Sequence, residues 1–128
     1  MKIIIDTPKW SFIKRKDDGS IDYISPFPCP FNYGSFLETE GEDGDREDIV
    51  VLGKKLKRGV QECEADRVCI VRFYDKGDFD PKYVYSNEDL TRIDLLKLYS
   101  FFLLFSILKL ALNTLKGKKG KTKFVGIN

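Results

Sequence analysis

Seven carboxylates crowd into eleven residues in the middle of this chain, between Glu38 and Asp48. The β-branched run Ile49 to Gly53 follows at once and is typical of a buried strand, so the acids lie at a strand entrance. Carboxylates held this close disfavour one another's ionisation unless cations neutralise them. The run therefore indicates a site for a hard divalent cation with oxygen ligands, Mg²⁺ or alternatively Mn²⁺.

Two other interpretations of the acidic run have to be weighed. An EF-hand calcium loop that begins at Asp43 needs glycine at its sixth position and glutamate at its twelfth. The chain has Asp48 and Lys54 at those positions, which argues against calcium. A solvated acidic loop without any metal remains open as the simpler alternative.

A second acidic cluster follows another predicted strand, Val68 to Phe73. The segment Tyr74 to Lys82 carries Asp75, Asp78 and Asp80 and ends in a lysine. Loops rich in Asp and Gly are normally hairpin turns. Two such clusters, each attached to a short apolar strand, favour one pocket in which both contribute metal ligands.

Composition limits the possible functions. The chain has 128 residues, which predicts a single domain over 1–128, and its net charge of +2 indicates no particular partner. Five lysines gather at positions 116, 118, 119, 121 and 123, but without an aromatic-rich basic face we predict no nucleic-acid partner. The absence of histidine excludes a His-based triad and argues against zinc. Three cysteines without CxxC spacing and the lack of a signal-peptide pattern predict a reduced, cytoplasmic protein.

Hydrophobic patterning predicts a mainly β fold. The segment Pro26 to Gly34 holds three prolines in five residues, so it should be extended and rigid, and it could aim Asn32 and Tyr33. A structural turn with a core tyrosine is an equal alternative for that segment. Lys54 to Gly59 is predicted as a basic loop. We predict strands at Lys2–Asp6, Trp10–Lys16, Ile21–Ser25, Ile49–Gly53, Val68–Phe73, Tyr83–Tyr85 and Lys123–Ile127.

One long C-terminal helix is expected to cover the strands. Thr91 and Asp94 have capping-box spacing, apolar residues dominate from Ile93 to Leu115, and Gly117 is a stop signal. Such a helix has about 24 residues and a length of roughly 36 Å. We expect it to pack across the strands, with a second copy of the chain on its remaining apolar face, which predicts a homo-oligomer. A helix on a membrane surface is the alternative, although the uninterrupted apolar part is too short to span, so no membrane partner is predicted.

Three segments resemble the soluble family I inorganic pyrophosphatases. They are NYG at Asn32 to Gly34, EDGDREDIVVLG at Glu42 to Gly53 and DKGDFDPK at Asp75 to Lys82, and their order and approximate spacing match that family. The resemblance implies a small five-stranded OB-like barrel with the long C-terminal α-helix packed on it. It also implies Mg²⁺-dependent hydrolysis of pyrophosphate to two phosphates, through a metal cluster bound by carboxylates.

The same resemblance implies roles for individual residues. Asp45 would take the proton from the attacking water, and Asp6 matches a glutamate at the rim of the family's site. The implied metal ligands are Asp43, Asp48, Asp75 and Asp80, and the implied phosphate contacts are Lys14, Tyr33 and Lys82.

The chain departs from the family pattern mainly among the phosphate contacts. Arg46 stands in place of a proline, and Lys16 and Tyr23 align with a glutamate and an arginine, while the glycine of the second acidic motif is displaced by one, at Gly77. A Tyr-Lys pair of the last helix falls on Phe105 and Ser106. Lys109, one turn further on, either replaces that lysine or is a structural lysine that reaches the surface.

These departures leave three functions open. The first is a Mg²⁺-dependent inorganic pyrophosphatase, whose substrate is pyrophosphate or a related phosphoanhydride. The second is a weakened relative that binds metal and a phosphorylated ligand, or that hydrolyses another phosphoanhydride. The third is an interaction module that uses the apolar helix or the lysine tail. Because the carboxylates are all retained, metal binding is the stronger expectation.

Overall fold

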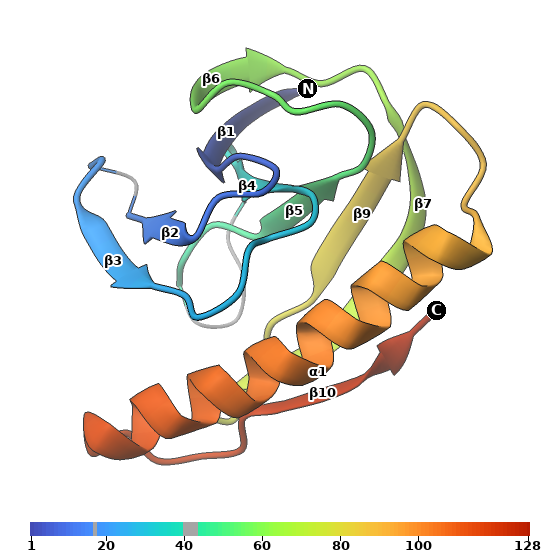
Figure 1. The fold of residues 1–128 in the computed structure, drawn as a ribbon. Helices are drawn as coiled ribbons and strands as arrows, with labels where there is room; N and C mark the ends of the chain where they lie inside the picture. Colours follow the sequence, from blue (N-terminus) through green and yellow to red (C-terminus); the bar gives the residue numbers. More distant parts are fainter. Residues whose placement is uncertain (17, 40–43) are drawn as a thin grey trace.

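A computed structural model describes residues 1–16, 18–39 and 44–128, and it has the mainly β architecture with one long helix that the sequence predicts (Figure 1). The elements in chain order are β1 (Lys2–Thr7), β2 (Ile13–Arg15), β3 (Ile21–Ile24), β4 (Asn32–Phe36), β5 (Asp48–Val51), β6 (Gly59–Glu62), β7 (Asp66–Asp75), β8 (Asp78–Phe79), β9 (Lys82–Ser86), α1 (Arg92–Leu115) and β10 (Lys123–Ile127).

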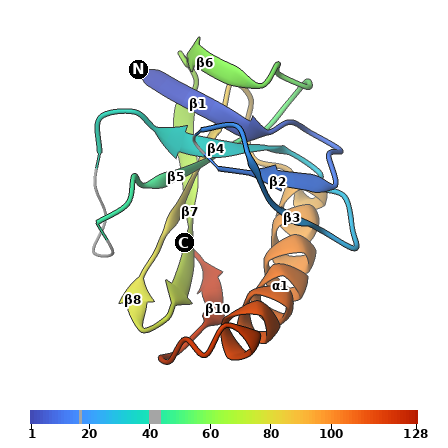
Figure 2. The same ribbon diagram turned by 90° about the vertical axis from the view of Figure 1, so that its left-hand side faces the viewer.

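The strands form one large twisted sheet and a separate β2–β3 hairpin. The order across the large sheet is β6-β1-β4-β5-β9-β7-β10, with β8 paired to β7. Figure 2 shows β1 and β4 crossing the direction of β7, as the twist of a long sheet requires. Among the strands of the described residues, only β5 and β9 pair in parallel, and Asp48 is the register partner of Lys82. The two strands therefore begin side by side at one end of the sheet.

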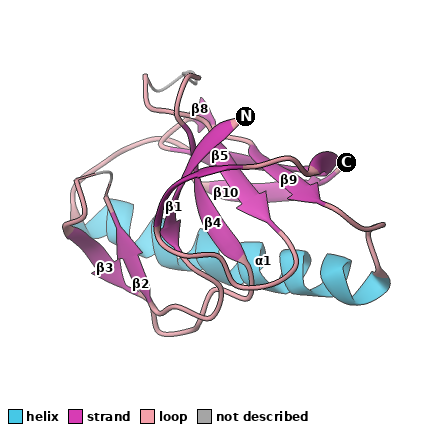
Figure 3. Cartoon of the chain, turned by 90° about the horizontal axis from the view of Figure 1, so that it is seen from above, coloured by secondary structure: helices cyan, strands magenta, loops and turns pink. Residues whose placement is uncertain are grey.

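The helix covers one face of this sheet, as Figure 3 shows from above. Thr91 and Asp94 form the expected capping box, and Gly117 follows the helix with φ of +70°. Leu98, Phe101, Phe102 and Phe105 lie on the covered face of α1. They pack with buried residues of the sheet and of the segment before β4: Cys29, Phe31, Tyr33, Val50, Cys69, Val71, Phe73 and Val84.

Several strand predictions are confirmed, and the differences have physical causes. The expected strand at Trp10–Lys16 is shortened to β2, because Trp10 has φ of +70° and cannot continue an extended chain. The proline-rich segment leads into β4, which the sequence analysis did not predict as a strand. It also missed β6 and the short β8, since neither has an alternating apolar pattern.

Close approach of β1 and β4 depends on Gly34. A Cβ atom placed on Gly34 would overlap the backbone carbonyl of Ile4, which cannot move without breaking the β1–β4 ladder. This contact explains why the NYG segment needs its glycine on structural grounds. It also holds Tyr33, the preceding residue, in fixed register with Val50 of β5.

We expect Gly34→Ala to lower the free energy of unfolding by more than about 2 kcal/mol, because the added methyl group overpacks a backbone contact. Gly117→Ala is the matched control, since nothing lies within 4 Å of a Cβ at Gly117. Gly117→Ala should lower the free energy of unfolding by only about 1 kcal/mol, because alanine disfavours the left-handed backbone conformation at this position. Urea unfolding of both variants measures the difference, and equal losses would contradict this account of Gly34.

Candidate active site

The two acidic segments meet around the buried ammonium group of Lys82. Its Nζ lies 2.5 Å from Oδ2 of Asp48 and 2.7 Å from Oδ2 of Asp80. Lys82 is only 2% exposed, whereas both carboxylates are about one-fifth exposed. Burial alone would lower the pKa of Lys82, but the charges of Asp48 and Asp80 and the hydrogen bonds to them raise it above its ordinary value. The lysine therefore remains charged and ties both segments together.

Tyr33 adds a second donor to the same carboxylate. Its hydroxyl donates to Oδ2 of Asp48 over 2.8 Å, and its ring lies below the ammonium groups of Lys14 and Lys82, at 5.5 and 6.0 Å from the ring centroid. Burial, followed by the nearby charge of Asp48, raises the pKa of Tyr33 well above its usual value. Tyr33 therefore stays protonated at neutral pH and donates a hydrogen bond to Asp48.

A cleft of about 180 Å³ brings these groups together with Asp45 and Asp75. Asp45 precedes β5 and Asp48 begins that strand, whereas Asp75 and Asp80 lie at the two ends of the β7–β9 connection. A fifth carboxylate, Asp22, comes from β3. Asp78 of the second acidic segment is not among the lining residues. The described residues that line the cleft are Lys14, Asp22, Tyr33, Asp45, Arg46, Asp48, Phe73, Asp75, Lys76, Asp80, Lys82, Phe105 and Lys109.

The cleft continues into an open basin of about 520 Å³ whose wall carries four cationic side chains and five carboxylates. Lys14, Arg15, Lys16 and Arg46 all line this basin. Lysine and arginine side chains bind phosphate oxygens, the first as a point charge and the second as a planar fork. The arrangement can therefore hold a polyanion next to a group of carboxylates.

Asp6 lines the basin but not the cleft. Its Oδ1 is 3.3 Å from Nζ of Lys14, and it also accepts a hydrogen bond from the hydroxyl of Thr7 over 3.0 Å. Burial raises the pKa of Asp6 to about 6 in spite of the opposing charge of Lys14. Lys14 is therefore oriented by a carboxylate that becomes protonated, and so neutral, in mildly acidic solution.

The departures from the family pattern have distinct structural outcomes. Lys109 lines the cleft, and its pKa is lowered by burial, so the lysine one turn along the helix does face the carboxylates. Ser106 instead donates its hydroxyl to the carbonyl oxygen of Leu103 over 2.7 Å. Arg46 lines both the cleft and the basin.

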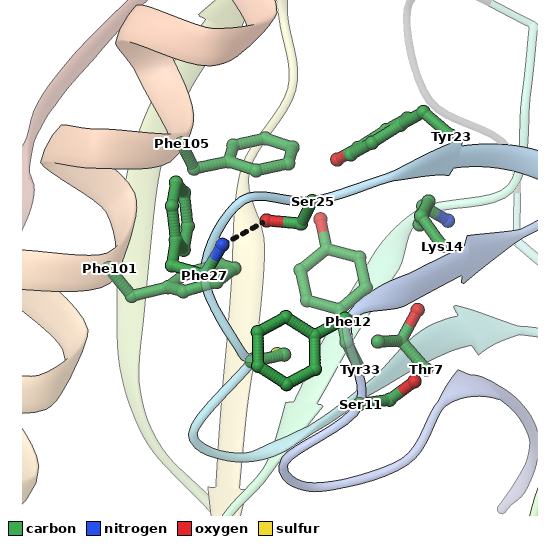
Figure 4. A pocket seen from close by; sticks show the side chains of 11 residues that line it. Thr7, Ser11, Phe12, Lys14, Tyr23, Ser25, Phe27, Tyr33, Phe101 and Phe105 are labelled. Carbon is green, nitrogen blue, oxygen red and sulfur yellow. Dashed lines mark hydrogen bonds between the residues drawn. The ribbon is translucent and has the colours of Figure 1, made fainter.

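Beside the cleft lies a small apolar pocket (Figure 4). Tyr33, Lys14 and Phe105 line both spaces, and Tyr23 closes the pocket on the side of β3. Its volume is about 30 Å³, which leaves room for about one water molecule and not for a substrate group. Tyr23 and Phe105, which stand where the family has phosphate contacts, thus contribute to apolar packing here.

The donor chemistry of the cleft fits a hard divalent cation. Asp45, Asp48, Asp75 and Asp80 offer only oxygen ligands, the kind that Mg²⁺ and Mn²⁺ prefer. In the described part of the chain, no three acidic or thiol side chains form a preassembled metal cluster, and Lys82 lies between two of these carboxylates. Asp43, the remaining expected ligand, lies outside the described residues.

The structure brings together every described residue that the sequence analysis assigned to the site: Lys14, Tyr33, Asp45, Asp48, Asp75, Asp80 and Lys82. Their individual roles stay predictions. Sequence reasoning did not single out Asn113, whose side-chain amide donates to Oδ1 of Asp75 over 2.8 Å. An asparagine in the last turns of an apolar helix was the only available signal.

Comparisons with known proteins show the family and the fold of this chain. A protein-family model described as inorganic pyrophosphatase matches residues 3–107 of the chain. The chain is similar over its full length to an inorganic pyrophosphatase from Helicobacter pylori, at 22% identity and a TM-score of 0.76, covering 83% of that chain. It is similar in the same way to the enzymes from Thermus thermophilus (27% identity, TM-score 0.71) and Neisseria gonorrhoeae (26% identity, TM-score 0.71), covering 81% of each. A search of curated protein sequences finds no match.

These neighbours confirm the expected OB-like fold with a C-terminal helix. They and the family match support inorganic diphosphatase activity, which makes the protein a hydrolase. The match spans the strands that carry both acidic segments and most of α1. The chain belongs to the inorganic pyrophosphatase family.

Proposed function

We propose that this protein hydrolyses inorganic pyrophosphate to two phosphates in a Mg²⁺-dependent reaction at the cleft around Lys82, with Mn²⁺ as a possible substitute. The observation that carries the proposal is the convergence of Asp48 and Asp80 on one ammonium group, within a cleft that Asp45 and Asp75 also line. If the two acidic segments were only solvated loops, nothing would bring them together, because they are more than 25 residues apart in sequence.

Each side chain has a role that its chemistry allows. Asp48, Asp75 and Asp80, together with Asp43, would hold the divalent cations. Bound cations of this kind lower the pKa of a water molecule and neutralise charge on the leaving phosphate. Asp45 is exposed at the mouth of the cleft and would accept the proton of the attacking water.

The phosphate oxygens would be bound by Lys14, Tyr33 and Lys82. Tyr33 stays protonated and can donate a hydrogen bond, and the two lysines supply positive charge. Lys109 would provide a further cation from α1, in place of the lysine that the family pattern has one turn earlier. Its burial beside the cleft supports this role over that of a surface lysine.

A weakened enzyme, or one that prefers another phosphoanhydride, is the second candidate. It is favoured by one observation: Phe105 and Ser106 contribute packing and an internal hydrogen bond where the family pattern has two phosphate contacts. A turnover assay over several phosphoanhydrides separates the two candidates, since the second predicts saturable pyrophosphate binding without matching release of phosphate.

We further propose that residues 1–128 form one domain that works in the cytoplasm. Cys29, Cys63 and Cys69 are all free thiols, as expected in a reducing compartment. Burial raises the pKa of Cys29 to about 12, so its thiol is a packing group and not a nucleophile.

The outer face of α1 supports a homo-oligomer. Leu96, Leu103, Leu104 and Ile107 are each about half exposed or more, on a helix that is long and apolar enough to cross a membrane by length and composition alone. The same face borders an apolar groove of about 360 Å³ lined by Trp10, Phe27, Pro28 and Pro30 beside Leu96 and Leu104. A leucine ridge next to an apolar groove can bury itself against the same surface of a second copy, as two-fold interfaces do.

Asp48→Asn and Asp80→Asn should each lower kcat for Mg²⁺-dependent phosphate release from pyrophosphate by about 100-fold or more, which is about 3 kcal/mol of the barrier. Asp66→Asn, at the far end of β7 and exposed, is the matched control and should keep full activity. Release that continues unchanged in both site variants, or no release by the unmodified protein in any divalent metal, contradicts the proposal.

In the same assay, Lys109→Met should raise KM for pyrophosphate by about tenfold, because a charged hydrogen bond is worth about 1.5–3 kcal/mol. Lys118→Met removes an exposed lysine just beyond the same helix and should leave KM unchanged. An unchanged KM in Lys109→Met would show that this lysine has only a structural role.

Leu103→Glu combined with Ile107→Glu should convert an oligomer into monomers, since a charge in the centre of an apolar interface costs several kcal/mol. Analytical ultracentrifugation measures the change, and Glu88→Lys, an exposed charge change before α1, serves as the control. An unmodified protein that is monomeric and binds lipid vesicles through α1 would contradict the oligomer and favour a membrane surface.

A further inference from the structure

A closed polar cluster holds Asp75 from behind the cleft. Asp75, Asn113 and Thr122 are 7%, 6% and 7% exposed, so water does not compete for their hydrogen bonds. The side-chain amide of Asn113 donates to Oδ1 of Asp75 over 2.8 Å and to Oγ1 of Thr122 over 2.9 Å. An amide nitrogen has two hydrogens, and both are used here, so the orientation of the amide is fixed.

The end of α1 fixes Asn113 itself. The backbone carbonyl of Asn113 accepts from the N–H of Lys118 over 2.9 Å, and that of Thr114 accepts from Gly117 over 3.1 Å. With Gly117 in the left-handed conformation at φ of +70°, these two bonds form a Schellman motif. The helix therefore ends at a defined place relative to Asp75.

The chain after the helix closes over the turn that follows Asp75, beside β8 in Figure 2. The N–H of Lys76 donates to Oγ1 of Thr122 over 3.2 Å, and the N–H of Gly77 donates to the carbonyl of Lys121 over 2.9 Å. A Cβ atom at Gly120 would overlap the backbone carbonyl of Lys76. The segment from Asn113 to Thr122 thus clamps the start of the second acidic segment.

Asp75 differs from the other carboxylates in the kind of partner it has. Lys82 neutralises Asp48 and Asp80, whereas in the described ranges no lysine or arginine forms an ion pair with Asp75. A buried carboxylate that is bonded only to neutral donors is costly unless a cation joins it. The amide of Asn113 orients the carboxylate without adding a charge of its own, so Asp75 can still attract a cation in the cleft, as it attracts Lys109.

We propose that Asn113 is a positioning residue for Asp75, which it holds in the orientation that binds the divalent cation. The proposal rests on the proposed function, because it takes Asp75 as a metal ligand. Asn113 and Thr122 both lie outside residues 3–107, the part that matches the family, so this support belongs to the C-terminal end of this chain. Partners of metal ligands commonly set affinity in this way.

The test is a calorimetric titration of the whole protein with Mn²⁺ alone. Asn113→Leu removes the donor but keeps the volume, and it should weaken Mn²⁺ binding by about 10–100-fold. Thr114→Val is the matched control, because it changes the next residue of the same helical turn, whose exposed hydroxyl donates to the carbonyl of Leu110. It should keep an affinity close to that of the unmodified protein. Asp75→Asn supplies the reference for loss of the ligand itself.

Nuclear magnetic resonance of the unmodified protein gives a second measurement that does not depend on the folding of any variant. The protein is titrated with Mg²⁺ in the absence of Mn²⁺. The side-chain amide signals of Asn113 should shift over the same range of Mg²⁺ concentration in which Mg²⁺ binds, because the carboxylate that accepts their hydrogen bond becomes a metal ligand.

Unchanged affinity in Asn113→Leu, or amide signals that stay still while Mg²⁺ binds, overturns the role of Asn113 and leaves the proposed function standing. Unchanged affinity in Asp75→Asn overturns it as well, since Asp75 would not be a ligand. No Mn²⁺ binding by the unmodified protein overturns the proposed function itself and this inference with it.

Discussion

The buried ion pairs of Lys82 are the interaction on which the rest of this site depends. An ammonium group that is 2% exposed persists only with charged partners, and removing one partner of a buried pair typically costs about 3–5 kcal/mol. Asp48 and Asp80 are those partners, and they come from the two acidic segments. The parallel register of β5 and β9 places Asp48 opposite Lys82, so the backbone pairing brings the two charged side chains together.

This arrangement also explains how like charges can be gathered at one end of a sheet. Lys82 and Tyr33 both donate to Oδ2 of Asp48, which reduces the repulsion between the two acidic segments before any other cation joins them. Asp75 and Asp45 extend the acidic surface beyond the reach of Lys82. The cleft is therefore stable as folded and still has carboxylate oxygens directed at its interior.

Much of the site could be predicted from the sequence because its residues sit in compact segments next to apolar strands. Asp48, Asp80 and Lys82 were identifiable from strand-end position and from the resemblance. Lys109 could be named as a candidate, but its role could not be assigned from the sequence. Only the packing of α1 decides which face of the helix lines the cleft. Asn113 could not be identified, because its contact with Asp75 joins residues 38 positions apart and depends on where the helix ends.

The fold was predictable to a similar degree and for similar reasons. The capping box at Thr91 and the stop at Gly117 are local signals, and the helix follows them closely. The strands β4 and β6 depend instead on pairing with β1, and no local sequence pattern indicates that pairing. A glycine at position 34 meets a steric need that appears only once β1 lies beside it.

The central claim is that the two acidic segments share divalent cations at one end of the sheet. Anomalous diffraction from crystals soaked in Mn²⁺ tests it most directly. The account predicts at least one manganese peak within coordination distance, about 2.0–2.6 Å, of oxygens from both Asp48 and either Asp75 or Asp80. Manganese bound only at other carboxylates, with none bridging the two segments, would contradict it.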